Sequence, residues 1–112
     1  MPAWGLRLVG PGGVARSIAD LARYVTAMYD PPDAMFGRAV ELATSLHADG
    51  PYGPMGLGWM HEDGIWCHRG TTAGFGCFVA FDRPSRAGVA LAMNSGGPTP
   101  LFAGRAPFCC PE

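Results

Sequence analysis

The sequence contains no lysine, and all eight basic residues among its 112 positions are arginine. Charged residues make up only 15% of the chain, with a formal net charge of −1. This balance offers no basic surface for nucleic acid or an anionic membrane. No apolar run reaches about 18 residues, so no transmembrane helix is predicted. The N-terminus lacks the apolar segment of a signal peptide, and a cytoplasmic location is expected.

Cysteine is scarce as well, with four residues at Cys67, Cys77, Cys109 and Cys110. No CxxC pair and no His/Cys metal spacing occurs, so neither a metal nor another cofactor is predicted. A reduced chain is the expectation. For Cys67 and Cys77 two interpretations stay open: neighbouring strands bring the thiols close together, or both act as small apolar residues.

The composition is that of one globular domain. Apolar residues make up 48% of the chain, and 112 residues are enough for a modest core. We therefore treat residues 1–112 as a single, partial domain. The 17 glycines and 11 prolines lie beside periodic segments and do not form a low-complexity tract.

Two helices are predicted in the first half. Ser17 and Asp20 form a capping-box pattern, and Asp30 before Pro31-Pro32 ends the helix. Its apolar face is predicted at helical spacing, from Ile18, Leu21, Ala22, Val25 and Met28. A second helix is expected over residues 34–46, with an apolar side formed by Met35, Val40, Leu42 and Leu46.

The second half changes to strand-like patterns. A short strand is expected over residues 55–60, and Asp63-Gly64 predicts a tight hairpin. Further strands are expected from Ile65, over residues 74–81 and over residues 88–93. The predicted fold class is α+β, with one or two N-terminal helices followed by an antiparallel β-meander. Residues 96–112 show no periodicity and are predicted to be irregular. Trp59 and Phe75 are expected in the core.

These motifs, taken in order, resemble a known family. "GGVARSIADLARYV", "GLGW" and "CHRGTTAGFGCFVAFDRPSRAGVALAMNS" are similar to the C-terminal part of the serine β-lactamase-like hydrolases. That group includes class C β-lactamases, D,D-peptidases and related esterases. The resemblance covers residues 12–95 and implies a partial β-lactamase/transpeptidase-like fold. A nucleotide-binding loop is excluded, because the glycines at 70–76 do not link a strand to a helix.

The resemblance also implies a site. His68, Arg69 and Gly70 fall on the family's Lys/His-x-Gly strand, which forms one wall of the active-site cleft. His68 would face the nucleophile, and Gly70 would let substrate approach the strand closely. The backbone N–H of Thr71 would form half of an oxyanion hole. Thr71 and Thr72 would also hydrogen-bond a substrate carboxylate or amide. Arg69, on the opposite side of the strand, is expected to face solvent or a salt bridge first and substrate second.

The sequence departs from the family at the nucleophile. These hydrolases use a Ser-x-x-Lys pair, which a chain without lysine cannot contain. A Tyr-x-Asn element is absent too, since the only asparagine is Asn94, preceded by Ala92-Met93. Losing part of such a unit removes several orders of magnitude of rate.

Two hypotheses remain. The chain is the C-terminal part of a serine hydrolase acting on a β-lactam, peptide or ester, inactive alone and completed by a complementary N-terminal chain. The alternative is a non-catalytic module that binds a ligand or partner through the remaining cleft strand. A truncated reading frame, a gene remnant and half of a split protein all fit the first hypothesis.

Overall fold

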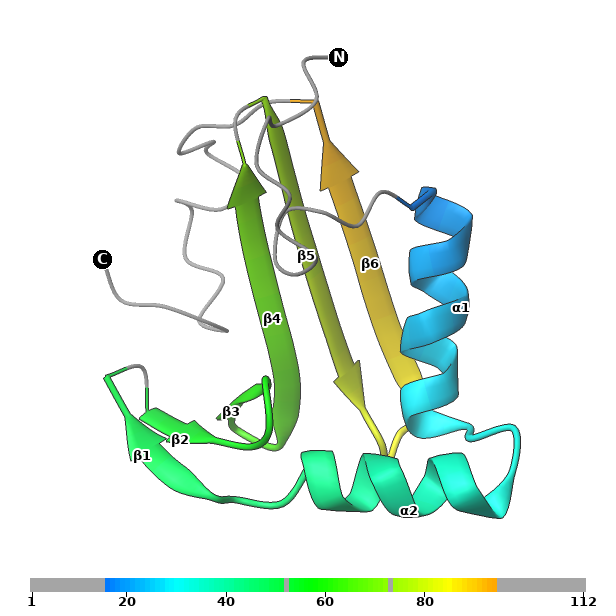
Figure 1. Ribbon diagram of the computed structural model, residues 1–112, viewed down its shortest axis with the longest axis vertical. Coiled ribbons are helices and arrows are strands. Elements are labelled where there is room, and N and C mark those ends of the chain that lie inside the picture. Colours follow the sequence, from blue (N-terminus) through cyan, green and yellow to red (C-terminus); the bar gives the residue numbers. More distant parts are fainter. Residues whose placement is uncertain (1–15, 52, 73, 95–112) are drawn as a thin grey trace, which may run out of the picture.

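The computed structural model describes residues 16–51, 53–72 and 74–94. Two helices precede a six-stranded antiparallel sheet in which each strand pairs with the next, so the predicted α+β meander is confirmed (Figure 1). The elements are α1 (Ile18–Tyr29), α2 (Ala34–Ala43), β1 (Ala48–Gly50), β2 (Gly53–Met55), β3 (Met60–Glu62), β4 (Ile65–Thr72), β5 (Phe75–Asp82) and β6 (Ala87–Met93). The tail predicted to be irregular, with Cys109 and Cys110, lies outside the described residues.

Helix α1 begins where its sequence predicts. The Ser17 side chain accepts a hydrogen bond from the backbone N–H of Asp20, and the Asp20 carboxylate accepts one from the backbone N–H of Ser17. This closed capping box satisfies backbone donors that the first turn leaves free. Val25 and Met28 are buried, as expected, whereas Ile18 is 50% exposed. The inward stripe therefore starts one turn later than predicted.

Helix α2 is shorter than predicted, and its buried side was assigned wrongly. It ends at Ala43, and of the four residues expected to face the core only Val40 is buried. Met35, Leu42 and Leu46 are exposed, while Phe36 and Ala43 pack beside Val40 against the core. Positions 36, 40 and 43 form a second stripe at helical spacing, and this stripe is the one that faces inward.

Residues 55–60, expected to form one strand, make the turn between two strands: β2 ends at Met55 and β3 begins at Met60. The backbone N–H of Gly56 donates to the carbonyl of Trp59 at 2.8 Å, and that of Leu57 donates to the carbonyl of Ala43 at 2.9 Å. A Cβ at Gly56 would overlap the Ala43 carbonyl oxygen. The turn is therefore fixed by the end of α2, which no local pattern reveals. Strand β1, which was not predicted, pairs with β2.

The hairpin between β3 and β4 forms as predicted. Asp63 has φ of 49° and Gly64 has φ of 84°, so both central residues adopt the left-handed conformation of a tight two-residue turn. The long hairpins follow, with β4 paired to β5 over seven residues and β5 paired to β6 over seven. Residues 70–72, in the glycine-rich stretch between the two expected strands, continue β4, and the strand expected over residues 74–81 is β5.

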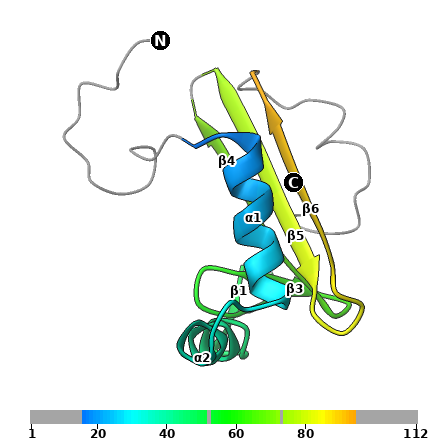
Figure 2. The same ribbon diagram turned by 90° about the vertical axis from the view of Figure 1, so that its right-hand side faces the viewer.

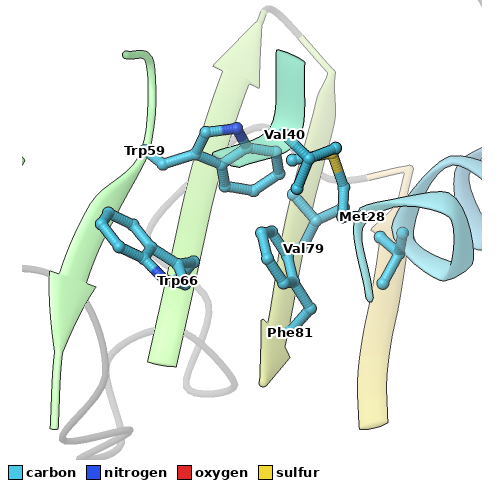
Figure 3. Close-up of a cluster of buried hydrophobic side chains, with 7 residues drawn as sticks. Met28, Val40, Trp59, Trp66, Val79 and Phe81 are labelled. Carbon is cyan, nitrogen blue, oxygen red and sulfur yellow. The ribbon is translucent and has the colours of Figure 1, made fainter. Parts of the chain in front are cut away.

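The main core lies on the helix-covered face of the sheet. Figure 3 shows six of its side chains converging from α1, α2, β4, β5 and the segment before β3; they are Met28, Val40, Trp59, Trp66, Val79 and Phe81. Trp59 meets Phe81 edge to face, with ring centroids 4.9 Å apart. The prediction that Trp59 is a core residue is confirmed, since it is 5% exposed. Phe75 was wrongly placed in the core, because it is 39% exposed.

Helix α1 packs closely against β5 and β6 (Figure 2). The residue of β6 under the helix is Gly88, where a Cβ would overlap Val25 and lie 3.0 Å from the ring of Tyr29. A salt bridge of 2.8 Å between Arg86 and Asp30 joins the β5–β6 turn to the end of α1. A glycine under the helix therefore sets the distance between helix and sheet.

The opposite face of the sheet carries a second, smaller cluster. Met60, Cys67 and Ala80 are buried there, and Met55, Ile65 and Phe78 pack against them. Val89 and Leu91 of β6 are 42% and 37% exposed. Among the described residues, neither helix is both long and apolar enough to cross a membrane.

Candidate functional site

The candidate site is the second half of β4, which extends past the end of β3. Strand β3 pairs only with Ile65, Trp66 and Cys67 of β4. Within the described residues, no strand pairs with residues 68–72 on that side, while β5 pairs with them on the other. An unpaired strand edge presents backbone N–H and C=O groups to an approaching molecule.

Alternation along β4 divides the predicted site residues between two faces. Trp66 belongs to the helix-side core, so His68 and Gly70 face that side as well. Cys67 belongs to the cluster on the other side, and Arg69 and Thr71 face that way. Arg69 is exposed and opposite to His68, as expected. The oxyanion-hole role predicted for Thr71 uses its backbone N–H, whereas its side chain, also expected to hydrogen-bond substrate, faces away from the His68 side.

His68 is exposed, and among the described residues its imidazole has no hydrogen-bond or ion-pair partner. Its cross-strand neighbour is Val79, a member of the main core. No described residue therefore holds the His68 imidazole by a hydrogen bond or an ion pair. The Thr72 backbone continues the strand, and its side chain lies outside the described part of the structure.

Gly70 lies opposite Cys77 in the β4–β5 register. A Cβ at Gly70 would lie 3.5 Å from the Cys77 sulfur, an ordinary contact, and no other atom of the described residues comes within 4 Å. Packing therefore does not require glycine here. Only a molecule approaching the strand from outside would distinguish glycine from alanine at this position.

The two cysteines expected on neighbouring strands lie on different faces. Cys67 pairs with Ala80 and is fully buried, whereas Cys77 pairs with Gly70 and carries an exposed, free thiol. Because adjacent side chains alternate between faces, Cys67 and Cys77 point to opposite sides of the sheet. The first of the two interpretations of this pair is therefore wrong. Cys67 is buried but disulfide-bonded, so the second interpretation does not describe it either, and the expectation of a reduced chain is wrong.

An aromatic pair on the helix-covered side of the sheet was missed by the sequence reasoning. Tyr24 of α1 stacks on Trp59, with ring centroids 6.2 Å apart and planes 20° from parallel. Trp59 shares the main core with Val79, the cross-strand partner of His68. Tyr24 is 45% exposed, and burial of the remainder raises the pKa of its phenol. The only sequence signal was the helical spacing of Leu21, Tyr24 and Met28, a spacing that favours one shared face.

Neither a metal cluster nor a serine lies beside His68 in the described part of the chain. Within the described residues, no three His, Cys, Asp or Glu side chains are grouped to hold a metal ion. Ser17 caps α1, Ser45 donates to the Glu41 carbonyl at 2.6 Å, and Ser85 is in the β5–β6 turn. None of these three serines is on β4 or β5 beside His68. Ser95 lies outside the described residues.

The fold and the free His-x-Gly strand together fit the class expected from the sequence, the serine β-lactamase-like hydrolases. A family model described as Beta-lactamase matches residues 1–108. The chain therefore belongs to the β-lactamase family. A search of curated proteins found no match.

Proposed function

We propose that the chain provides one wall of an acyl-transfer active site, the wall formed by β4, for a β-lactam, peptide or ester. The observation that supports this is the edge of β4 at residues 68–72, beyond the end of β3, with which no strand of the described residues pairs. An extended substrate could align along this edge through backbone hydrogen bonds. Family membership supplies the reaction class, serine hydrolase chemistry.

Each residue of this wall has a distinct role in the proposal. Gly70 leaves room for the substrate beside the strand, and the Thr71 backbone N–H donates to the oxyanion that develops in the tetrahedral transition state. His68 provides the hydrogen-bonding or cationic group on the nucleophile side. Thr72 binds a substrate carboxylate or amide. Arg69 lies on the other face, so its contact would be with the substrate's far end or with solvent.

The attacking group has to come from elsewhere. The 112 residues contain no lysine, so no Ser-x-x-Lys pair is available to activate a serine. We propose that a complementary N-terminal chain carries this pair and the Tyr-x-Asn element. Turnover by the 112 residues alone would then be absent, while substrate binding along β4 is retained.

The test combines a covalent and a non-covalent measurement on the full chain. Intact-mass spectrometry after exposure to a fluorophosphonate, and separately to benzylpenicillin, should show no adduct. Acetyl-D-alanine methyl ester, followed by amide chemical-shift mapping, should shift the resonances of residues 68–72. A stoichiometric adduct on one serine would overturn the mechanism. Ester binding that leaves β4 unshifted would overturn the assignment of the wall.

A second candidate function is a non-catalytic module that holds a ligand or partner on the same strand. The lysine-free sequence favours it, since binding by β4 needs no nucleophile. The two proposals differ in whether an active complex forms. Hydrolysis of the ester after addition of a chain bearing Ser-x-x-Lys and Tyr-x-Asn supports the first, and binding without turnover in that mixture supports the second.

A further inference from the structure

The face of the sheet opposite the helices contains a disulfide. Cys67 lies in the smaller cluster on that face, and its sulfur is disulfide-bonded. The sequence holds four cysteines, and Cys77 carries a free thiol that points to the other face. Elimination therefore leaves Cys109 and Cys110 as the candidates for the bond partner of Cys67.

The same face has an apolar surface that the described residues leave open. Helix α1 packs on the other side of the sheet, over β5 and β6 (Figure 2). Val89 and Leu91 of β6 pair with β5 residues of the smaller cluster, so their side chains point to its face. They are 42% and 37% exposed. Exposed aliphatic side chains beside a buried cluster mark a surface that a further segment can cover.

The end of β6 lies within reach of this disulfide. Met93 pairs with Gly76, four residues along β5 from Ala80, the partner of Cys67. With about 3.3 Å per residue along a strand and about 4.8 Å between strands, Met93 and Cys67 are roughly 16 Å apart. The chain from Met93 to Cys109 could extend about 50 Å. It is therefore long enough to cross the face before it reaches Cys67.

We propose that residues 96–112, the C-terminal segment, cover this face of the sheet, and that a disulfide between Cys67 and Cys109 or Cys110 holds them there. Any cysteine bonded to Cys67 has its Cα atom about 4.4–6.8 Å away, directly beside the smaller cluster. Since Cys67 precedes His68 on β4, the bond joins the C-terminal segment to the strand of the candidate site, from the opposite face. The inference does not depend on the function proposed above.

The composition of the C-terminal segment fits the surface that it would cover. Only two of its residues are charged, Arg105 and Glu112. Its large apolar residues are Leu101, Phe102 and Phe108. Packing these side chains against Val89 and Leu91 would remove apolar area from water on both sides of the contact.

The pairing is tested by mapping tryptic peptides of the full chain without reduction, after free thiols are blocked with iodoacetamide. Cleavage after arginine separates the cysteines into peptides 39–69, 70–86 and 106–112. Peptides 39–69 and 106–112 should be joined, and peptide 70–86 should carry one blocked thiol. A free peptide 39–69, or one joined to peptide 70–86, would overturn the pairing. The unreduced chain should have the intact mass of a monomer, and a disulfide-linked dimer would assign the face to a second copy instead.

Docking of the C-terminal segment is read from nuclear Overhauser effects between the methyl groups of Val89 and Leu91 and the rings of Phe102 and Phe108. These effects should be present in the unreduced chain. Dithiothreitol transfers two electrons and two protons to the bond, forms two thiols and becomes a cyclic disulfide, and the effects should then disappear. Their absence before reduction would overturn the docking, and their persistence after it would overturn the role of the disulfide.

Cys109→Ser combined with Cys110→Ser removes the proposed bond and leaves the sheet unchanged. Its midpoint of urea denaturation should fall, because the bond no longer restricts the unfolded chain, and it should bind more anilinonaphthalene sulfonate at the uncovered face. Cys77→Ser is the matched control, since it removes the free thiol from the other face, and should change neither property. Unchanged values in the double variant would overturn the proposal. Should that variant fail to fold, the peptide map and the Overhauser effects of the unaltered chain decide the question.

Discussion

Gly70 and Cys77 face each other across β4 and β5, and within the described residues the Cys77 sulfur is the one atom near a Cβ placed at Gly70. A methyl group added at Gly70 would lie 3.5 Å from that sulfur, at ordinary van der Waals distance. This glycine is therefore not required by the fold. Gly70 therefore differs from a glycine that close packing requires, and its replacement can test for a ligand at this strand.

Gly70→Ala should leave stability nearly unchanged and weaken ligand binding. Alanine fits the strand, and reduced freedom of the unfolded chain offsets the small cost of the new contact, so the free energy of unfolding should change by less than about 1 kcal/mol. The methyl group occupies the surface on which the substrate would lie. Urea denaturation and the affinity for acetyl-D-alanine methyl ester provide the two readouts. Unchanged affinity would show that ligands do not approach Gly70.

Gly88→Ala is the contrasting substitution and should destabilise the chain. The new methyl group would overlap Val25 and crowd Tyr29, so α1 would have to move away from β6. Overpacking of this kind costs about 1–3 kcal/mol. Urea denaturation should show the loss, and the double variant Gly88→Ala with Val25→Ala should lose less than the two single changes added together. Additive losses would mean that Val25 and Gly88 do not meet.

The contrast between these glycines shows what the sequence could and could not predict. Local signals worked where the partners are neighbours in the chain: Ser17 with Asp20 at the start of α1, and Asp63 with Gly64 in the hairpin. Local signals failed where a residue distant in the sequence determines the backbone conformation. The turn after β2 depends on the Ala43 carbonyl, and no pattern within residues 55–60 contains that information.

The buried side of α2 illustrates the same limit. Two apolar stripes run along this helix, one through Met35 and Leu42 and one through Phe36 and Val40, and helical periodicity fits both. Only tertiary packing chooses between them. At the site, the position of His68 and Gly70 on a strand followed from the motif, whereas the Tyr24–Trp59 pair on the helix-covered side of the sheet joins segments far apart in sequence.

Ser17→Ala should destabilise α1 and alter the acid response of the chain. Loss of the cap costs about 1 kcal/mol. The hydrogen bond from the Ser17 side chain is the main cause that holds the pKa of Asp20 below its usual value. Because the folded pKa is depressed, this contribution is present above the unfolded pKa of about 3.9 and is lost as pH falls through the folded value.

Stability measured by urea denaturation between about pH 6 and pH 3 checks the Asp20 prediction. The unaltered chain should lose part of its stability over the acid end of this range, and Ser17→Ala should show a smaller loss there. Thr26→Ala is a control on the same helix, since the Thr26 hydroxyl donates to the Ala22 carbonyl and touches no carboxylate. Parallel pH curves for Ser17→Ala and the unaltered chain would contradict the assignment.

Tyr24 should make the chain sensitive to alkaline pH. Burial against Trp59 raises the pKa of its phenol, so on raising the pH the unfolded chain ionises first, from about pH 10. The unfolded state then binds fewer protons than the folded state, and the free energy of unfolding falls as pH rises through this range. Tyr24→Phe has no group to ionise and keeps the ring stacked, so its stability should fall less between about pH 9 and pH 11. Tyr29→Phe is the control, because it removes a phenol from the same helix and keeps the ring; its stability should follow that of the unaltered chain. If Tyr24→Phe loses as much stability as the unaltered chain over this pH range, the Tyr24 phenol is fully solvated and its ring does not rest on Trp59.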